Sequence, residues 1–209
     1  MLGSERGKYS PVHPNDHVNM AQSTNDVIPT AIRIACIAQL PALSESIQSL
    51  IDALANKGKE FDGIVKAGRT HLQDAMPIRL GQEFNAYAGT LRRNLKRVNE
   101  AADYLRDLGI GGSAVGTGVN VEPQYPMLMV RHLRKMTSLD LREGEDRIQL
   151  MQSMGDVSAF SAQLRTMAVD LGKIASDLRL LASGPRTGLD EIRLPAVQPG
   201  SSIMPGKVN

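Results

Sequence analysis

The sequence lacks tryptophan, has three phenylalanines and four tyrosines, and contains one cysteine, Cys36. A single cysteine excludes an intrachain disulfide, and no paired Cys/His spacing of the zinc-binding kind is present. Cys36 stands in the apolar run IRIACIAQL, where we expect a buried, unreactive thiol. The scarcity of aromatic rings favours a core of Leu, Ile, Met and Ala, which suits helices packed along a narrow seam.

The sequence also lacks a strong excess of charge and a long apolar run. Its 24 basic and 22 acidic residues give a net charge of +2, which argues against nucleic acid or an anionic membrane as the partner. The basic cluster Arg92, Arg93, Lys96 and Arg97 has no interleaved aromatics to stack bases, so we interpret it as a solvated or subunit-facing surface. Neither an apolar leader nor a stretch of about 20 apolar residues is evident, which predicts a cytoplasmic protein without membrane contact.

Helical periodicity dominates the chain. Apolar residues recur three or four positions apart from Pro29 to about residue 60, in 79–108 and in 146–182, and we expect Pro41 to kink or divide the first run. The third run would be longer than about 50 Å at about 1.5 Å per residue, more than the width of a compact domain of this size. We therefore predict an all-α bundle of long helices that packs against other copies, with irregular structure in 1–28 and a loop region in 184–209.

Four polar segments separate these helices: HPNDHVNMAQSTND (13–26), GRTHLQD (68–74), GGSAVGTGVN (111–120) and GSSIMPGKVN (200–209). These segments also have structural explanations that involve no ligand. QSTND is typical of a helix N-cap, and the glycines permit tight turns. Together they offer hydroxyls, amides and a lysine, which are the groups that hold a small dianion.

Three of these segments carry a specific resemblance. VNMAQSTNDVIPTAIRIA, GRTHLQDAMPIRLGQEF and GSSIMPGKVN are similar to the three signature regions of the fumarase/aspartase superfamily, in the same order, and the likeness extends from about Val12 to Asn209. Members of this family eliminate a group from succinyl-type substrates to release fumarate. The resemblance implies a homotetramer in which each active site is assembled from three subunits.

Within the superfamily, two branches stay open. Ile203, Gly206 and Val208 resemble the fumarase and aspartase branches. Thr24, where fumarases usually carry serine, and the stretch DLRLLASGPRTGLDEI favour aspartase, the ammonia-lyase that acts on L-aspartate. A class II fumarase is the first alternative, and a helical scaffold that retains the motifs without turnover is the second.

The resemblance also implies roles for individual residues. Ser201 would act as an alkoxide base on the proton next to a carboxylate, and the aci-carboxylate formed would need preorganised donors. His71 would be the second catalytic residue and, with Asn25, would hold the leaving amino group. A further set would bind substrate: Ser23, Thr24 and Ser202 at the reacting carboxylate, and Thr70, Lys207 and Asn209 at the other carboxylate. Arg69, Gln73 and Asp74 would support them, and 111–120 would shape the backbone nearby. We expect neither a cofactor nor a metal.

Length sets the last expectation. Members of the superfamily are about twice as long, with further segments before and after the region matched here. We therefore interpret residues 1–209 as part of one central helical domain and as an internal fragment of a longer enzyme, and the fragment alone is expected to be less active than the whole.

Overall fold

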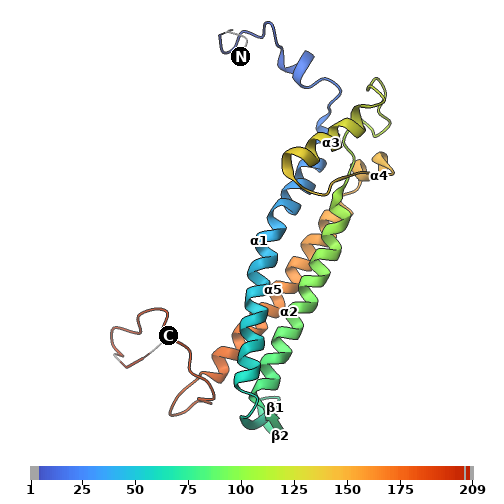
Figure 1. The fold of residues 1–209 in the computed structure, drawn as a ribbon. Coiled ribbons are helices and arrows are strands. Elements are labelled where there is room, and N and C mark those ends of the chain that lie inside the picture. Colours follow the sequence, from blue (N-terminus) through green and yellow to red (C-terminus); the bar gives the residue numbers. More distant parts are fainter. Residues whose placement is uncertain (1–4, 205, 208–209) are drawn as a thin grey trace. The chain divides into compact units, whose positions relative to one another are not determined.

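The computed structural model describes residues 5–204 and 206–207. The chain forms two compact units, Met1–Thr166 and Met167–Asn209. Helices predominate, which confirms the predicted all-α class (Figure 1). The elements, in chain order, are η1 (Pro14–Val18), α1 (Thr24–Glu60), β1 (Val65–Thr70), β2 (Gln73–Arg79), α2 (Leu80–Asp103), η2 (Tyr104–Arg106), β3 (Asp107–Leu108), α3 (Tyr125–Thr137), β4 (Arg142–Glu143), α4 (Arg147–Gln152) and α5 (Gly155–Leu181), whose second part belongs to the second unit.

Helix α1 begins earlier than the periodicity predicts, at Thr24 rather than after Pro29. The reason is local, because Ser23 caps the helix and the apolar pattern starts only after the first turn. Pro41 does not divide α1, which is continuous over 37 residues. An interior proline removes one backbone hydrogen bond, at a cost of about 3 kcal/mol, and the buried neighbours Ile37 and Leu40 show that packing compensates for it.

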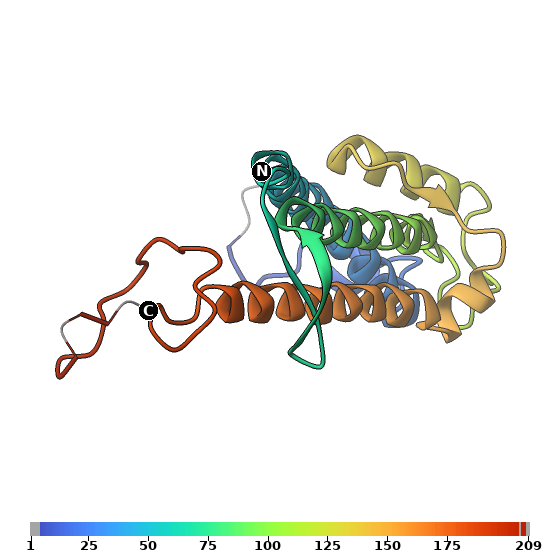
Figure 2. The ribbon, with the colours of Figure 1, turned by 90° about the horizontal axis from the view of Figure 1, so that it is seen from below.

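Helices α1 and α2 run side by side (Figures 1 and 2). Close approach at one end requires glycine at position 81, where a Cβ would lie 2.2 Å from the carbonyl oxygen of Gly58. A Cβ on Gly58 would lie 2.3 Å from Oδ1 of Asn85, the end of a side chain that could move aside. The helix predicted over 79–108 ends at Asp103, where η2 and β3 follow it, so its last part is wrong. Eight of the apolar residues predicted in this run are nevertheless buried in the core, the last two of them beyond α2: Leu80, Phe84, Tyr87, Leu91, Val98, Ala102, Leu105 and Leu108.

The stripe predicted on α1 is only partly covered. Ile47, Ile51 and Leu54 are buried, whereas Ile32 and Leu50 are each 37% exposed. Cys36 on the same helix is a half-buried free thiol, so the prediction of full burial is wrong. Apolar surface therefore remains exposed along this long helix.

The third predicted helical run is two helices, α4 and α5. Ser153 adopts an extended backbone, with φ −116° and ψ 126°, and its Oγ accepts a hydrogen bond from the N–H of Gly155 at 3.2 Å. This side-chain bond competes with helix continuation, and the apolar steps of three and four carry across the break without revealing it.

Periodicity also missed the β1–β2 hairpin, α3 and the two-residue parallel pair β3–β4. The hairpin follows α1, precedes α2 and projects from the ends of both helices (Figure 2). It contains the segment GRTHLQD, for which the sequence predicted a place between two helices and site residues but no strands.

Helix α1 contains an apolar stretch that the sequence analysis did not predict. It is the one helix among the described residues with a window, of mean hydropathy 1.5, that meets the length and composition of a membrane span. The core helix of a water-soluble protein meets the same criteria, so this is weak evidence. Arg33, fully buried within α1 and paired with Asp156, favours a core helix.

Candidate functional site

The first polar motif forms the N-terminus of α1. Ser23 is the N-cap residue: its Oγ accepts the N–H of Asn25 at 3.2 Å, and its own N–H donates to Asp26 Oδ1 at 2.9 Å. The Ser23 hydroxyl therefore keeps its hydrogen for donation, and Thr24 and Asn25 are exposed. The structural explanation of QSTND as a cap is confirmed, and it leaves hydroxyl donors beside a helix N-terminus, where anions are favoured.

The glycine-rich segment 111–120 contacts this motif. Asn25 Nδ2 donates to the carbonyl oxygen of Ala114 at 2.8 Å. Asp26 is fully buried, and its Oδ2 accepts the N–H groups of Gly111 and Ser113 at 3.0 Å each. The sequence assigned no contact to Asp26. Its position in the capping box was a signal for the bond to Ser23, but nothing in the sequence showed the bonds to the distant loop.

The second motif occupies the hairpin. Thr70 and Gln73 pair across a two-residue turn, in which His71 has φ 50° and Leu72 has φ 65°. Both values lie in the left-handed region that Asn and Gly usually occupy in such turns, so the turn is strained. Thr70 and His71 are exposed.

Two features brace this hairpin. Arg69 Nε lies 3.7 Å from Asp74 Oδ1 on the opposite strand, consistent with the supporting role expected for that pair. Gly68 stands at a break in the strand register, where a Cβ would lie 2.8 Å from the carbonyl oxygen of Met76.

These two motifs are not brought together within one chain. Ser23 precedes α1 and the hairpin follows it, and 37 helical residues at about 1.5 Å each extend about 55 Å. Figure 1 shows the hairpin at the opposite end of α1 from its N-terminus. A small dianion cannot contact both motifs of the same chain.

The third motif lies in the second unit as a closed loop. Ser201 Oγ accepts the N–H of Ile203 at 3.4 Å, Met204 N–H donates to the Ser201 carbonyl at 3.2 Å, and Lys207 N–H donates to the Met204 carbonyl at 2.9 Å. A Cβ on Gly200 would lie 1.9 Å from the Lys207 carbonyl oxygen, so the loop closes only with glycine there. Ser202 is exposed, and Asn209 lies outside the described residues.

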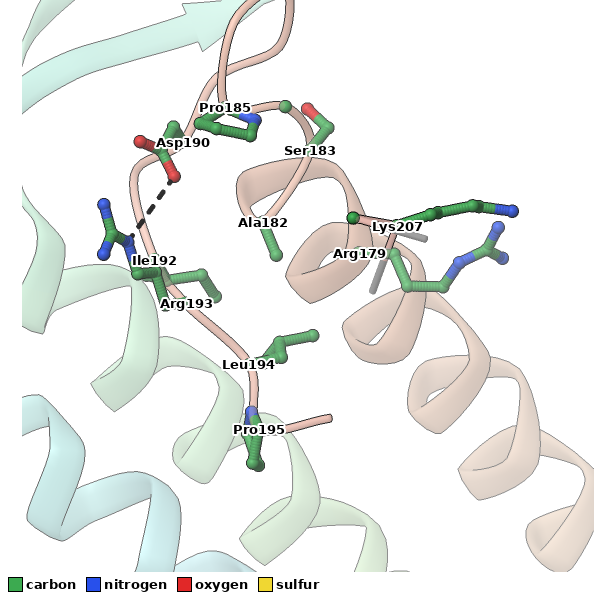
Figure 3. Close-up of a pocket in the computed structure, with 12 residues that line it drawn as sticks. Arg179, Ala182, Ser183, Pro185, Asp190, Ile192, Arg193, Leu194, Pro195 and Lys207 are labelled. Carbon is green, nitrogen blue, oxygen red and sulfur yellow. Dashed lines mark ion pairs between the residues drawn. The ribbon is translucent and has the colours of Figure 1, made fainter. Parts of the chain in front are cut away.

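A pocket of about 540 Å³ adjoins this loop within the second unit (Figure 3). Three cationic side chains line it, those of Arg179, Arg193 and Lys207, together with Asp190, whose Oδ1 lies 3.9 Å from Arg193 Nε. The excess positive charge suits a carboxylate ligand. Lys207 lines the pocket and Ser201 does not.

Among the described residues, no group of three or more His, Cys, Asp or Glu side chains could hold a metal ion. The three motifs instead offer hydroxyl, amide, imidazole and ammonium groups. Such groups bind carboxylates and transfer protons.

Comparison with known proteins identifies the family. A protein-family model described as Lyase matches residues 1–209. The chain belongs to this lyase family. Its resemblance to the fumarase/aspartase superfamily is thereby confirmed, and relatives of both branches are found.

An aspartate ammonia-lyase from Pseudomonas canavaninivorans is 51% identical over 209 residues, covering 100% of this chain and 44% of that protein. A class II fumarate hydratase from Neisseria meningitidis serogroup A is 47% identical over 210 residues, covering 100% of this chain and 46% of that protein. A crystal structure of a fumarate lyase:delta crystallin from Brucella melitensis, bound to cobalt, superposes with a TM-score of 0.95 at 50% identity, covering 100% of this chain and 45% of that one. The chain thus spans less than half the length of the lyases that it matches.

Proposed function

We propose that this chain supplies the central helical part of an aspartate ammonia-lyase that converts L-aspartate reversibly into fumarate and ammonia. Family membership supports a lyase. The chain has similar sequence identities to an aspartate ammonia-lyase and to a fumarate hydratase, so these identities do not distinguish ammonia from water as the leaving group. The observation that carries the choice is in the sequence, where Thr24 and the stretch DLRLLASGPRTGLDEI resemble aspartases. The orientation of Asn25 is compatible with this choice: because the Ala114 carbonyl can only accept, the Asn25 amide must turn its NH₂ toward it, which leaves Oδ1 as the acceptor. Such an acceptor suits an ammonium group, although a hydroxyl can also donate to it.

In the proposed reaction, the Ser201 alkoxide removes a proton from Cβ of L-aspartate. The electron pair first charges the neighbouring carboxylate, which becomes an aci-carboxylate held by the hydroxyls of Ser23, Thr24 and Ser202. It then forms the C=C bond as the Cα–N bond breaks. The amine leaves already protonated, so no strong general acid is needed.

The other carboxylate is held by Thr70, Lys207 and Asn209 in this proposal, and the leaving amine by Asn25 and His71. The Ile203 N–H at Ser201 Oγ is one stabilising donor for the alkoxide, and the charge of Lys207 is a second. We propose that the reaction needs no metal or cofactor.

We further propose that the protein works as a cytoplasmic homotetramer. The support is the length of α1, which separates Ser23 from His71 by about 55 Å and requires that different copies supply the two motifs to one site. The partly exposed Ile32 and Leu50 on α1 are apolar surface that neighbouring helices could cover.

The decisive experiment follows fumarate absorbance when the intact protein is given L-aspartate or L-malate. We expect fumarate and an equal amount of ammonia from L-aspartate. Fumarate from L-malate alone would establish the fumarase alternative, and fumarate from neither would leave the non-catalytic scaffold.

Subunit mixing tests the shared site. Ser23→Ala and His71→Ala proteins, each impaired alone, should regain activity when they are dissociated and reassembled together, because some sites then receive both intact motifs. If mixing restores nothing while mixed oligomers form, the two motifs do not meet across subunits.

A further inference from the structure

The buried carboxylate of Asp26 ties two distant segments together. It is 0% exposed and accepts three backbone N–H bonds: Ser23 at 2.9 Å on Oδ1, and Gly111 and Ser113 at 3.0 Å on Oδ2. A carboxylate taken out of water must be compensated by hydrogen bonds, and here each oxygen is compensated by a different segment. The side chain therefore fixes the Ser23 backbone relative to the loop.

The loop that receives these bonds is itself confined. Gly111 has φ +89°, and a Cβ there would lie 2.5 Å from Cγ of Pro126 at the start of α3. A Cβ on Gly116 would lie 2.6 Å from Cα of Ile148 in α4. With two helices this close to its backbone, the loop has little room to move. Its hydrogen bonds to Asp26 therefore hold the N-terminus of α1 in place.

We propose that Asp26 is a positioning residue for the reaction. By bonding both to Ser23 N–H and to the loop 111–118, it holds the Ser23 backbone at a fixed place relative to that loop. This placement determines where the hydroxyls of Ser23 and Thr24 meet the reacting carboxylate. This inference rests on the proposed function for the identity of the ligand. Asp26 does not itself contact substrate. The Asn25–Ala114 bond runs to the same loop. The loop would therefore position both the carboxylate-binding hydroxyls and the amine-binding amide.

Asp26→Asn in the intact protein tests the proposal. The amide keeps the size of the side chain, but its NH₂ cannot accept, so at least one backbone N–H loses its partner. We expect kcat for L-aspartate to fall roughly 10- to 100-fold in folded, correctly assembled protein, because small displacements of catalytic groups are costly.

Asp156→Asn is the matched control. It removes the charge of another carboxylate that pairs with a buried group, Arg33, and that ion pair does not involve the loop. We expect it to lower the melting temperature while kcat stays at the wild-type value. If Asp26→Asn lowers only the folded fraction, with kcat per folded molecule unchanged, Asp26 is structural and the proposal is wrong.

A measurement on the unmutated protein covers the case in which Asp26→Asn does not fold. Succinate, a non-reacting dicarboxylate, should slow hydrogen exchange in peptides covering 21–27 and also in those covering 109–116, which do not contact it. Protection confined to 21–27 would overturn the coupling.

The same probe separates this proposal from the proposed function. If the intact protein converts neither L-aspartate nor L-malate, the function fails, yet succinate protection at 109–116 would still support the positioning role. If turnover of L-aspartate is normal and Asp26→Asn leaves kcat unchanged, the function stands and the positioning role fails.

Discussion

The side chain of Asn25 donates from Nδ2 to the carbonyl oxygen of Ala114, 89 positions along the chain, at 2.8 Å. This contact joins the first turn of α1 to the glycine-rich loop. It also orients the amide, since an Asn25 side chain held by its NH₂ keeps its oxygen as an acceptor for other groups.

Replacing Asn25 by alanine should therefore weaken recognition of the amino group selectively. We expect kcat/KM for L-aspartate to fall roughly 10- to 100-fold, as for loss of a hydrogen bond to a charged group. Inhibition by succinate, which has no amino group, should change little. Asn99→Ala is the matched control, because Asn99 also donates to a carbonyl, that of Leu95 at 2.9 Å, on exposed helix surface. Equal losses for L-aspartate and succinate would contradict the assigned role.

Replacing Ser201 by alanine should remove the base without removing the binding site. Turnover should fall at least about 10³-fold, in line with the loss of a catalytic nucleophile or base. Succinate binding, followed by calorimetry, and the oligomeric state should persist. Ser202→Ala, in the same loop, should lower kcat by a much smaller factor, because it removes one of the three hydroxyls proposed to hold the aci-carboxylate and leaves the base in place. Comparable kcat losses in the two variants would assign no special role to Ser201.

Much of this fold is predictable from the sequence, for identifiable reasons. The apolar residues from Leu80 to Ala102 are confirmed as the buried face of α2, because burial on one face imposes a period that needs no knowledge of the partner. The explanation of QSTND as a helix cap is also confirmed, since Ser23 caps α1.

The missed features depend on interactions that a linear pattern does not encode. The break between α4 and α5 rests on one Ser153 side-chain bond within an uninterrupted apolar period. The hairpin turn carries His71 and Leu72 where Asn and Gly would have signalled it. Two of the three bonds of Asp26 span more than 80 positions, with separations of 85 for Gly111 and 87 for Ser113.

The turn makes a direct prediction about local stability. Leu72 is 69% exposed with φ 65°, so its side chain contributes little burial in this chain and its backbone conformation is unfavourable. Leu72→Gly should stabilise the hairpin by up to about 1 kcal/mol, the net of the relieved strain and the added chain entropy. Hydrogen exchange of peptides covering 64–79 measures it.

Met76→Gly provides the comparison within the same hairpin. Met76 is 74% exposed on β2 and is not among the residues with positive φ. This substitution should speed hairpin exchange, since glycine weakens a strand. If both glycine variants speed exchange alike, the Leu72 backbone is not the source of strain.

Tyr125, at the start of α3, makes stability depend on alkaline pH. Burial raises the pKa of its hydroxyl above the ordinary value of 10.0, and the Asp26 carboxylate raises it further. The folded protein thus favours the neutral phenol, and this stabilisation is present below pH 10 and is lost as the pH rises through the folded pKa. Tyr125→Phe should remove that component of alkaline destabilisation.

The measurement compares urea midpoints at pH about 9 and about 11. The urea midpoint of Tyr125→Phe minus that of the unmutated protein should be larger at the higher pH. Tyr104→Phe, at a tyrosine that is 65% exposed, is the matched control. An identical difference at both pH values would show that the Tyr125 hydroxyl does not contribute to the alkaline loss.

The ion pair of Arg33 and Asp156 should be asymmetric in its cost of removal. Arg33 Nη2 lies 2.7 Å from Asp156 Oδ2, and Nη1 donates to the Tyr104 carbonyl at 2.9 Å; the side chain of Arg33 is 1% exposed and that of Asp156 is 28% exposed. Asp156→Ala leaves a buried cation with one carbonyl partner and should lower the free energy of unfolding by about 3 kcal/mol. Arg33→Met fills the same space with an apolar chain and leaves a carboxylate that water can reach, so its cost should be smaller.

Urea unfolding of the two variants and of their double mutant gives the order of the two losses in unfolding free energy and the coupling energy between Arg33 and Asp156. If Arg33→Met is the more damaging change, the stabilisation comes from the bond to Tyr104 and from packing rather than from the charge pair.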